Sequence, residues 1–132
     1  MKKLATTIAA SSVLLSTALG VSAQEHAADI AAIESLLSKY ERALNASDTQ
    51  SIIPLYAEDG VFMAQHNFPA VGTEALTAAY DAVFENIQLT VEFQIDEIVQ
   101  QAPDWVFVRT QSAGKVFIKA AGIEASEGNQ EL

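Results

Sequence analysis

Few side chains in this sequence could carry out chemistry, and Tyr40 is the first of them. In the stretch KYERALNASD, its phenol could donate a proton to a substrate oxygen, or its ring could simply fill a core. A histidine side chain can act as an acid or a base, which makes His66 a second candidate, although a loop histidine is more often a surface residue. Tyr40 and His66 are therefore the candidate catalytic residues.

Other kinds of site lack the residues they need. The chain has no cysteine, and its two histidines, His26 and His66, match no zinc or iron spacing, so we expect no metal and no cofactor. It contains no nucleophile elbow and no glycine loop that could hold a phosphate. Asp48 and Asp59 stand at predicted helix ends, where capping and turn roles are commoner than catalysis.

The first 23 residues have the layout of a secretory signal peptide. A basic start is followed by an uncharged apolar run and by small residues at Val21 and Ala23, so we expect cleavage before Gln24. A retained membrane anchor is the alternative. Residues 24–132 then form one exported domain, periplasmic or extracellular.

The charge of the chain limits its partners. The formal net charge is −10, and it falls to −12 when Lys2 and Lys3 are removed with the leader. Such an acidic surface repels phosphate backbones and anionic lipids, so we expect neither a nucleic-acid partner nor a membrane partner after cleavage.

Three helices are predicted in the first two thirds of the chain. An apolar stripe with helical spacing, which includes Tyr40, defines the first and points Tyr40 inward; its members are Ile30, Ile33, Leu37, Tyr40 and Leu44. A short second helix has Asp48 or Ser51 as its N-cap, and Pro54 favours Ser51. The third runs from about 73 to 86, with Thr73 as its cap.

The strands follow a different periodicity. A short strand is expected at 61–64, followed by a loop over QHNFPAVG. Apolar residues alternate from Leu89 to Ile95, and the alternation slips at Asp96-Glu97, which indicates a bulge. Further strands are expected on either side of a turn at Ala113-Gly114, with a loop over GIEASEG and a new strand beginning at NQEL. Three helices and an antiparallel sheet make an α+β fold.

At this point the sequence resembles the nuclear transport factor 2-like superfamily, which includes ketosteroid isomerases and SnoaL-like polyketide cyclases. The resemblance rests on KYERALNASDTQSIIPLYAEDGVF and on FPAVGTEAL, and it covers nearly all of residues 24–132. It implies a cystatin-like cone, in which three N-terminal helices are wrapped by a curved antiparallel sheet around an apolar pocket. It also implies frequent homodimers and further strands beyond Leu132, without which residues 24–132 should fold poorly.

The resemblance also assigns roles. Tyr40 matches the isomerase tyrosine that donates a hydrogen bond to the substrate oxyanion, whereas the position of the isomerase base falls on Ala64. A methyl group cannot transfer a proton, so isomerase chemistry is disfavoured. The expected pocket residues combine this resemblance with the aromatic content of the chain: Tyr40, Phe62, Ala64, Tyr80, Phe93 and Phe107.

Three functions remain open. The first is an exported protein that binds a small, largely apolar molecule in the cone. The second is an acid–base enzyme of the cyclase or isomerase type, with Tyr40 as electrophile and His66 or a residue beyond Leu132 as base. The third is a dimerisation or interaction module whose cone is filled by its own side chains.

Overall fold

The computed structural model describes residues 15–131, and the chain forms two compact units, one up to Ile33 and one from Glu34 onward. Helix α1 (Leu15–Asn45) belongs to both. In the first unit the described residues are helical and, from His26, mostly exposed. Residues 1–14, which hold much of the predicted signal peptide, lie outside the described range. No described helix combines the length and the apolar character needed to cross a membrane.

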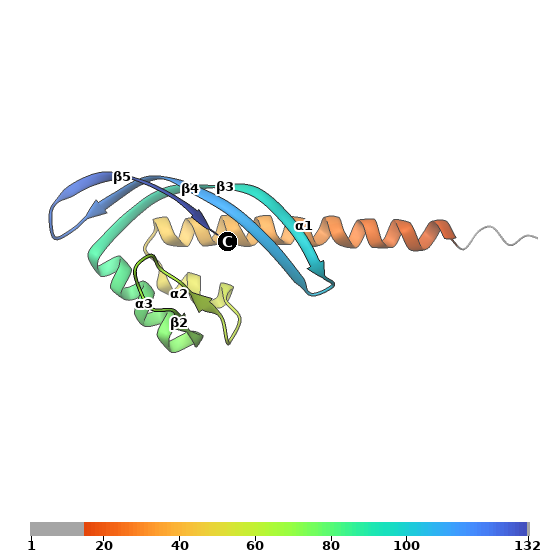
Figure 1. Ribbon diagram of the computed structural model, residues 1–132, viewed down its shortest axis with the longest axis horizontal. Coiled ribbons are helices and arrows are strands. Elements are labelled where there is room, and N and C mark those ends of the chain that lie inside the picture. Colours follow the sequence, from red (N-terminus) through yellow and green to blue (C-terminus); the bar gives the residue numbers. More distant parts are fainter. Residues whose placement is uncertain (1–14, 132) are drawn as a thin grey trace, which may run out of the picture. The chain divides into compact units, whose positions relative to one another are not determined.

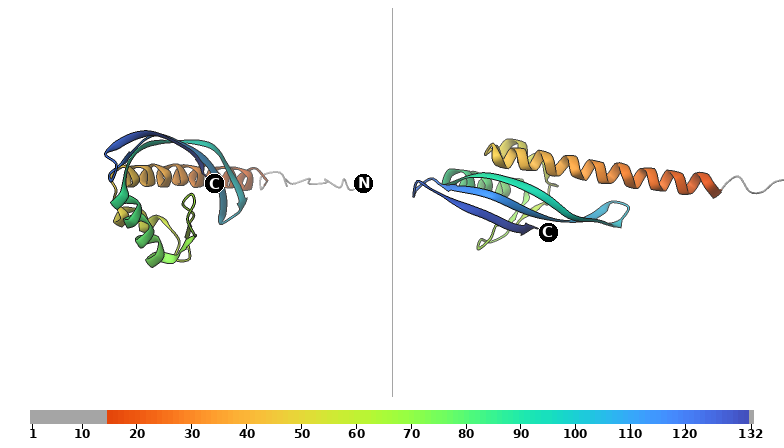
Figure 2. Two further views of the ribbon diagram at one scale, coloured as in Figure 1. Left: turned by 60° about the vertical axis from the view of Figure 1, so that its left-hand side comes forward. Right: turned by 90° about the horizontal axis from the view of Figure 1, so that it is seen from above.

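Besides the end of α1, the second unit contains two short helical segments, one longer helix and two antiparallel sheets (Figures 1 and 2). The elements are α2 (Thr49–Ile52), η1 (Ile53–Leu55), β1 (Val61–Phe62), β2 (Ala70–Val71), α3 (Gly72–Asn86), β3 (Ile87–Ala102), β4 (Trp105–Ile118) and β5 (Ile123–Glu131). β1 pairs with β2, and the larger sheet has the order β3-β4-β5. The α+β class with three helices and an antiparallel sheet is thus confirmed.

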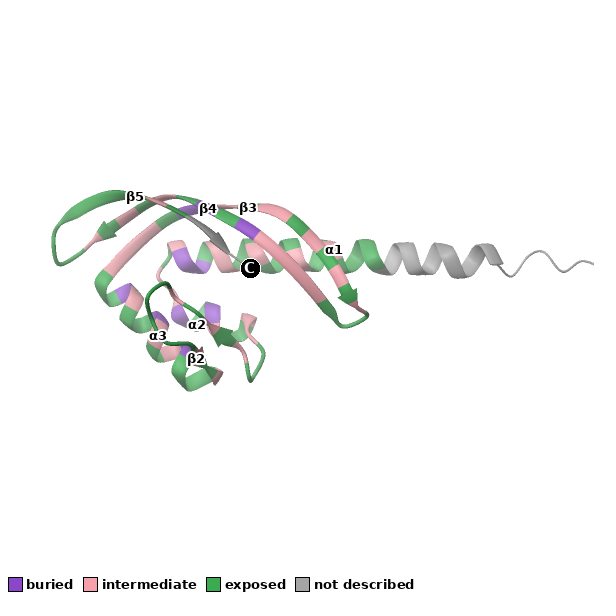
Figure 3. Cartoon of the chain, in the orientation of Figure 1, coloured by how far each residue is buried: buried purple, intermediate pink, exposed green. Residues whose placement is uncertain are grey.

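The core of the second unit lies between α3, α2 and the end of α1. Leu76, Tyr80 and Phe84 recur every four residues along α3, and all three are buried. They cluster with Leu44 from the end of α1 and Ile52 from α2. Figure 3 shows buried residues on these helices, together with further buried residues on β3 and β4. The helical periodicity therefore identified the covered faces correctly.

The first half of β3 also follows its predicted pattern. Leu89 and Phe93 pack against the core, whereas Thr90 and Glu92 between them are exposed. The register passes from Ile95 opposite Thr110 directly to Glu97 opposite Arg109, so Asp96 is the extra residue of a bulge. The predicted bulge is confirmed.

Side chains from α1 satisfy the free edge of β3. The side chain of Asn45 accepts a hydrogen bond from the backbone N–H of Val91 and donates one to its carbonyl, both at 2.8 Å. Glu41 Oε2 accepts from the N–H of Phe93 at 2.7 Å. Glu41 and Asn45 are four residues apart on the helix, and Val91 and Phe93 are two residues apart on the strand. Both separations are about 6–7 Å, so each helix side chain lies beside one strand residue. Glu41, which is not part of the apolar stripe of α1, thus helps to pair an edge strand.

Both preferred helix caps were wrong. The N-cap of α2 is Asp48, whose carboxylate accepts from the backbone N–H of Ser51. Pro54 is accommodated because α2 gives way to η1, in which proline occupies the first turn. Helix α3 begins at Gly72 after Val71 and has no side-chain cap, so Thr73 lies inside the helix.

Several strand boundaries also differ from the predictions. The strand expected at 61–64 is limited to Val61–Phe62, and the predicted loop after it contains β2, its partner. β4 continues through Ala113-Gly114, where a turn was expected. The strand expected to begin at NQEL is present, but it already starts at Ile123, so residues 123–128 are strand and not loop. Gly114 lies so close to β3 that a Cβ there would be 2.1 Å from the carbonyl oxygen of Thr90. This glycine therefore permits close strand packing, and the chain does not turn at it.

Candidate functional site

A cavity of about 520 Å³ lies between the segment after β1 and the second half of α3. Phe62 and Ala64 line one side of it, and Ala79, Ala82 and Val83 belong to the α3 side. The remaining lining residues are Asn67, Phe68, Ala70, Asn86 and Ile87. The lining is mainly apolar and contains no carboxylate and no histidine. Two predicted pocket residues, Phe62 and Ala64, thus meet at one cavity.

Behind Phe62 lies a cluster of three tyrosines. The hydroxyl oxygen of Tyr80 is 2.8 Å from that of Tyr40 and 2.7 Å from that of Tyr56. Tyr80 is fully buried, and its ring stacks on Phe62 with centroids 4.6 Å apart. Phe62 therefore contacts the tyrosine cluster and also lines the cavity. Tyr56 was not among the predicted site residues, although it lies in the quoted motif.

Burial raises the pKa of Tyr80 far above the ordinary value of a phenol, and its two phenol neighbours raise it further. Tyr80 therefore stays protonated at any physiological pH. A phenol donates one hydrogen bond and can accept two, so Tyr80 can accept from one tyrosine while it donates to the other. A chain of hydroxyls that runs in one direction strengthens the terminal donor, because each bond polarises the next. Tyr40 and Tyr56 are the two tyrosines that bond to Tyr80 in this cluster.

The other predicted residues occupy different surroundings. Phe93 lies beside Tyr40, with ring centroids 5.8 Å apart. Phe107 lies opposite Val99 in the register. Because β4 alternates regularly, the side chain of Phe107 is on the other face of the sheet from that of Thr110, which is buried. His66 is exposed, with φ 63°, in the turn closed by the bond from Asn67 N–H to Ala64 O. The structure therefore does not bring His66 or Phe107 to the tyrosines.

The carboxyl group of Glu127 on β5 was not predicted as a site residue, because no sequence pattern marks it. Glu127 pairs in register with Gly114, which in turn lies opposite the buried Val91 on β3. Its Oε2 is buried and has no hydrogen-bond partner within the part of the chain that the structure describes. Only the strand register shows that Glu127 shares a sheet face with Val91. Residues 26–128, whose side-chain exposure is described, contain no cluster of three potential metal ligands.

These elements define an α+β domain of the nuclear transport factor 2-like type, with an apolar cavity beside a hydrogen-bonded tyrosine cluster. The family model described as SnoaL-like domain matches residues 37–130. The chain therefore belongs to the SnoaL-like domain family, and the resemblance seen in the sequence is confirmed.

Solved structures agree with this assignment. A ketosteroid isomerase-like protein from Erwinia carotovora atroseptica is 35% identical, with a TM-score of 0.73 over 76% of this chain and 77% of that one. A conserved protein from Planctomyces limnophilus (23% identity, TM-score 0.67, 78% and 79% covered) has the same fold. So does a proposed scytalone dehydratase from Novosphingobium aromaticivorans (15% identity, TM-score 0.68, 82% and 73% covered). No match was found among curated proteins.

Proposed function

We propose that this chain is an exported protein that binds a small, largely apolar molecule in the cavity beside Phe62 and Ala64. The observation that carries the proposal is the cavity itself. Its volume of about 520 Å³ lies within the usual range for small-molecule sites, and its lining is mainly apolar. Export is part of the proposal because residues 1–23 have the pattern of a secretory leader.

Exposed apolar side chains beside the cavity support binding. Phe68 lines the cavity and yet is 95% exposed, and Met63, next to Ala64, is 74% exposed. An apolar ligand seated in the cavity would remove part of this surface from water, at about 25 cal/mol for each Å² covered. Because the lining contains no carboxylate, the cavity is better suited to binding than to proton transfer.

The binding proposal predicts ligand-dependent stabilisation that a filled cavity abolishes. Among steroids, aromatic polyketides and fatty acids, at least one should stabilise the protein by more than about 1 kcal/mol at ten times its Kd. Ala82→Phe places a ring in the cavity and should weaken that ligand at least about tenfold, since a filled cavity excludes it. Thermal shift measurements across a concentration series give both quantities.

Ala75→Phe is the matched control. Ala75 and Ala82 are both exposed positions of α3, but only Ala82 lines the cavity. Ala75→Phe should therefore leave the Kd unchanged. Equal weakening by both substitutions would contradict a site in this cavity. A lack of response to every compound would favour the interaction module.

A second candidate, an acid–base enzyme, is favoured by the bond between Tyr40 and Tyr80 and by the buried Oε2 of Glu127. Tyr40 would donate a hydrogen bond to a developing oxyanion, and Glu127 would carry or accept a proton. Isomerase chemistry that relies on a base after β1 stays disfavoured, because Ala64 lies there. The identity of 35% to an isomerase-like protein makes acid–base chemistry by Tyr40 and Glu127 worth testing.

The enzyme candidate predicts that Tyr40→Phe lowers turnover of an enone or polyketide substrate at least about tenfold, because one preorganised donor is lost. Stability should change little, since the ring remains in contact with Phe93. Steady-state kinetics and thermal denaturation of the same preparation measure the two effects. If activity and stability fell together, the phenol would be structural.

A further inference from the structure

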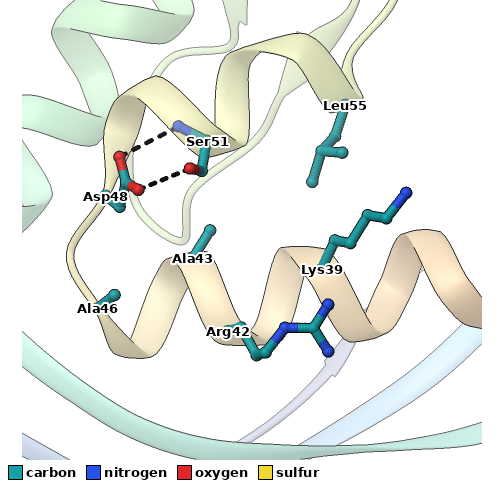
Figure 4. A pocket seen from close by; sticks show the side chains of 7 residues that line it. All are labelled: Lys39, Arg42, Ala43, Ala46, Asp48, Ser51 and Leu55. Atoms are coloured by element: carbon teal, nitrogen blue, oxygen red, sulfur yellow. Dashed lines mark hydrogen bonds between the residues drawn. The ribbon is translucent and has the colours of Figure 1, made fainter.

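A second hollow lies between the last turns of α1 and the segment formed by α2 and η1 (Figure 4). Its volume is about 430 Å³. Lys39, Arg42 and Ala43 line it from α1, Ala46 follows directly after that helix, and Asp48, Ser51 and Leu55 complete the lining. None of these residues belongs to the cavity beside Phe62. This hollow, called here the α1–α2 groove, is therefore a separate site.

The α1–α2 groove contains two cationic side chains that have no ionic partner among the described residues. Elsewhere in the described chain, Arg109 approaches Glu97 at 3.3 Å, Lys115 binds Glu124 at 2.7 Å, and Lys119 donates to the carbonyl of Phe84. Lys39 and Arg42 form no ion pair with a described residue, and both are exposed. In a chain with 17 acidic and 7 basic residues, two neighbouring unpaired cations stand out.

The opposite wall of the groove carries one negative charge. Asp48 accepts hydrogen bonds from the backbone N–H of Ser51 at 3.1 Å and from its hydroxyl at 2.6 Å. The hydroxyl bond and then the backbone bond lower the pKa of Asp48, so its carboxylate is ionised at neutral pH. The groove thus combines two positive charges with one negative charge.

We propose that the α1–α2 groove binds the carboxylate of a small organic acid that has an apolar tail. The guanidinium group of Arg42 offers the paired donors that suit a carboxylate, and Lys39 adds a second positive charge three residues earlier on the same helix face. Ala43, Ala46 and Leu55 form the apolar part of the lining, against which a short alkyl or aryl tail can pack.

The net charge of the groove selects among anions. A monocarboxylate neutralises the single excess positive charge, whereas a phosphate dianion would leave excess negative charge beside Asp48. The net charge of −10 on the whole chain also disfavours multiply charged anions. The ligand class is therefore a monocarboxylate, and the binding should weaken as salt screens the charges.

Titration of the isotope-labelled full-length chain with hexanoate, followed by amide chemical shifts, tests the proposal. Hexanoate should shift the amides of residues 39–55 in a saturable way, and its neutral analogue hexanamide should bind at least about tenfold more weakly, because it lacks the charge. Lys39→Gln combined with Arg42→Gln should lower the hexanoate affinity at least about tenfold. Glutamine is a good helix former, so the thermal midpoint should stay near that of the parent chain.

Two control variants locate the site. Lys115→Gln removes a cation from β4, which does not line the groove, and should leave hexanoate binding unchanged. Ala82→Phe fills the other cavity and should also have no effect, so failure of the cavity proposal and failure of this one are distinguishable. The proposal is overturned if hexanamide binds as well as hexanoate, if hexyl phosphate binds more tightly, or if the double substitution leaves the affinity unchanged.

Discussion

Replacing Tyr80 with alanine should lower the free energy of unfolding by about 3–5 kcal/mol, the range seen when large buried aromatic side chains are truncated. Tyr80 has no exposed surface. Four aromatic rings, from Tyr40, Tyr56, Phe62 and Phe84, have centroids between 4.6 and 6.5 Å from its own. The substitution would leave a cavity among them and remove the bonds to two hydroxyls. Urea denaturation followed by circular dichroism measures the effect as a shift in midpoint.

Tyr80→Phe is the control that separates packing from hydrogen bonding. It keeps the ring and removes the oxygen that bonds to Tyr40 and Tyr56, so it should cost about 1–2 kcal/mol. The difference between the two variants then reports the packing contribution. A loss with phenylalanine as large as the loss with alanine would mean that the hydroxyl bonds, not the aromatic contacts, hold this core together.

Much of the fold could be predicted because the two periodicities record which side of each element is covered. The stripe through Leu37 and Tyr40 gave the inner face of α1, and the alternation from Leu89 to Ile95 gave the covered face of β3. The slip at Asp96 predicted the bulge for the same reason, since one extra residue inverts the alternation.

The pairing of strands could not be predicted in the same way. β1 and β2 are two residues each, which is too short for a period to be seen. The sequence of β5 is mostly polar at both alternating sets of positions, so its first part, 123–128, was interpreted as a loop and the strand was expected to begin only at NQEL. Ala113-Gly114 was interpreted as a turn, since glycine is common in turns. Glycine also occurs where two strands approach closely, and the sequence alone does not distinguish these two uses.

The candidate site was predictable only in part. The stripe on α1 placed Tyr40 inside, and the family resemblance suggested Phe62 and Ala64 as pocket residues, both of which line a cavity. The bonds from Tyr80 to Tyr40 and Tyr56 join residues 40 and 24 positions apart, and no local pattern encodes such contacts. The α1–α2 groove was missed for a related reason. Lys39 and Arg42 are not part of the apolar stripe of α1, and only the packing of α2 beside them forms a lined hollow.

Gly114→Ala should be the second most damaging single substitution, with an expected loss of about 3 kcal/mol or more, at the upper end of the overpacking range. An added Cβ would lie 2.1 Å from the carbonyl oxygen of Thr90 and 2.9 Å from the Cα of Val91. Both are backbone atoms, so no side chain can move aside. The central strand β4 would have to move away from β3, which would weaken the ladder between them. Thermal or urea denaturation measures the loss.

Gly128→Ala provides the matched control on the same sheet. An added Cβ at Gly128 would lie 3.7 Å from the carbonyl oxygen of Ser112, an ordinary contact. Its effect should therefore be small, and a lower backbone entropy of the unfolded chain could even make it slightly stabilising. If Gly114→Ala were as well tolerated as Gly128→Ala, the strands could not approach as closely as described. Position 114 would then have no need of glycine, and the continuous β4 that crosses the predicted turn would lose its physical explanation.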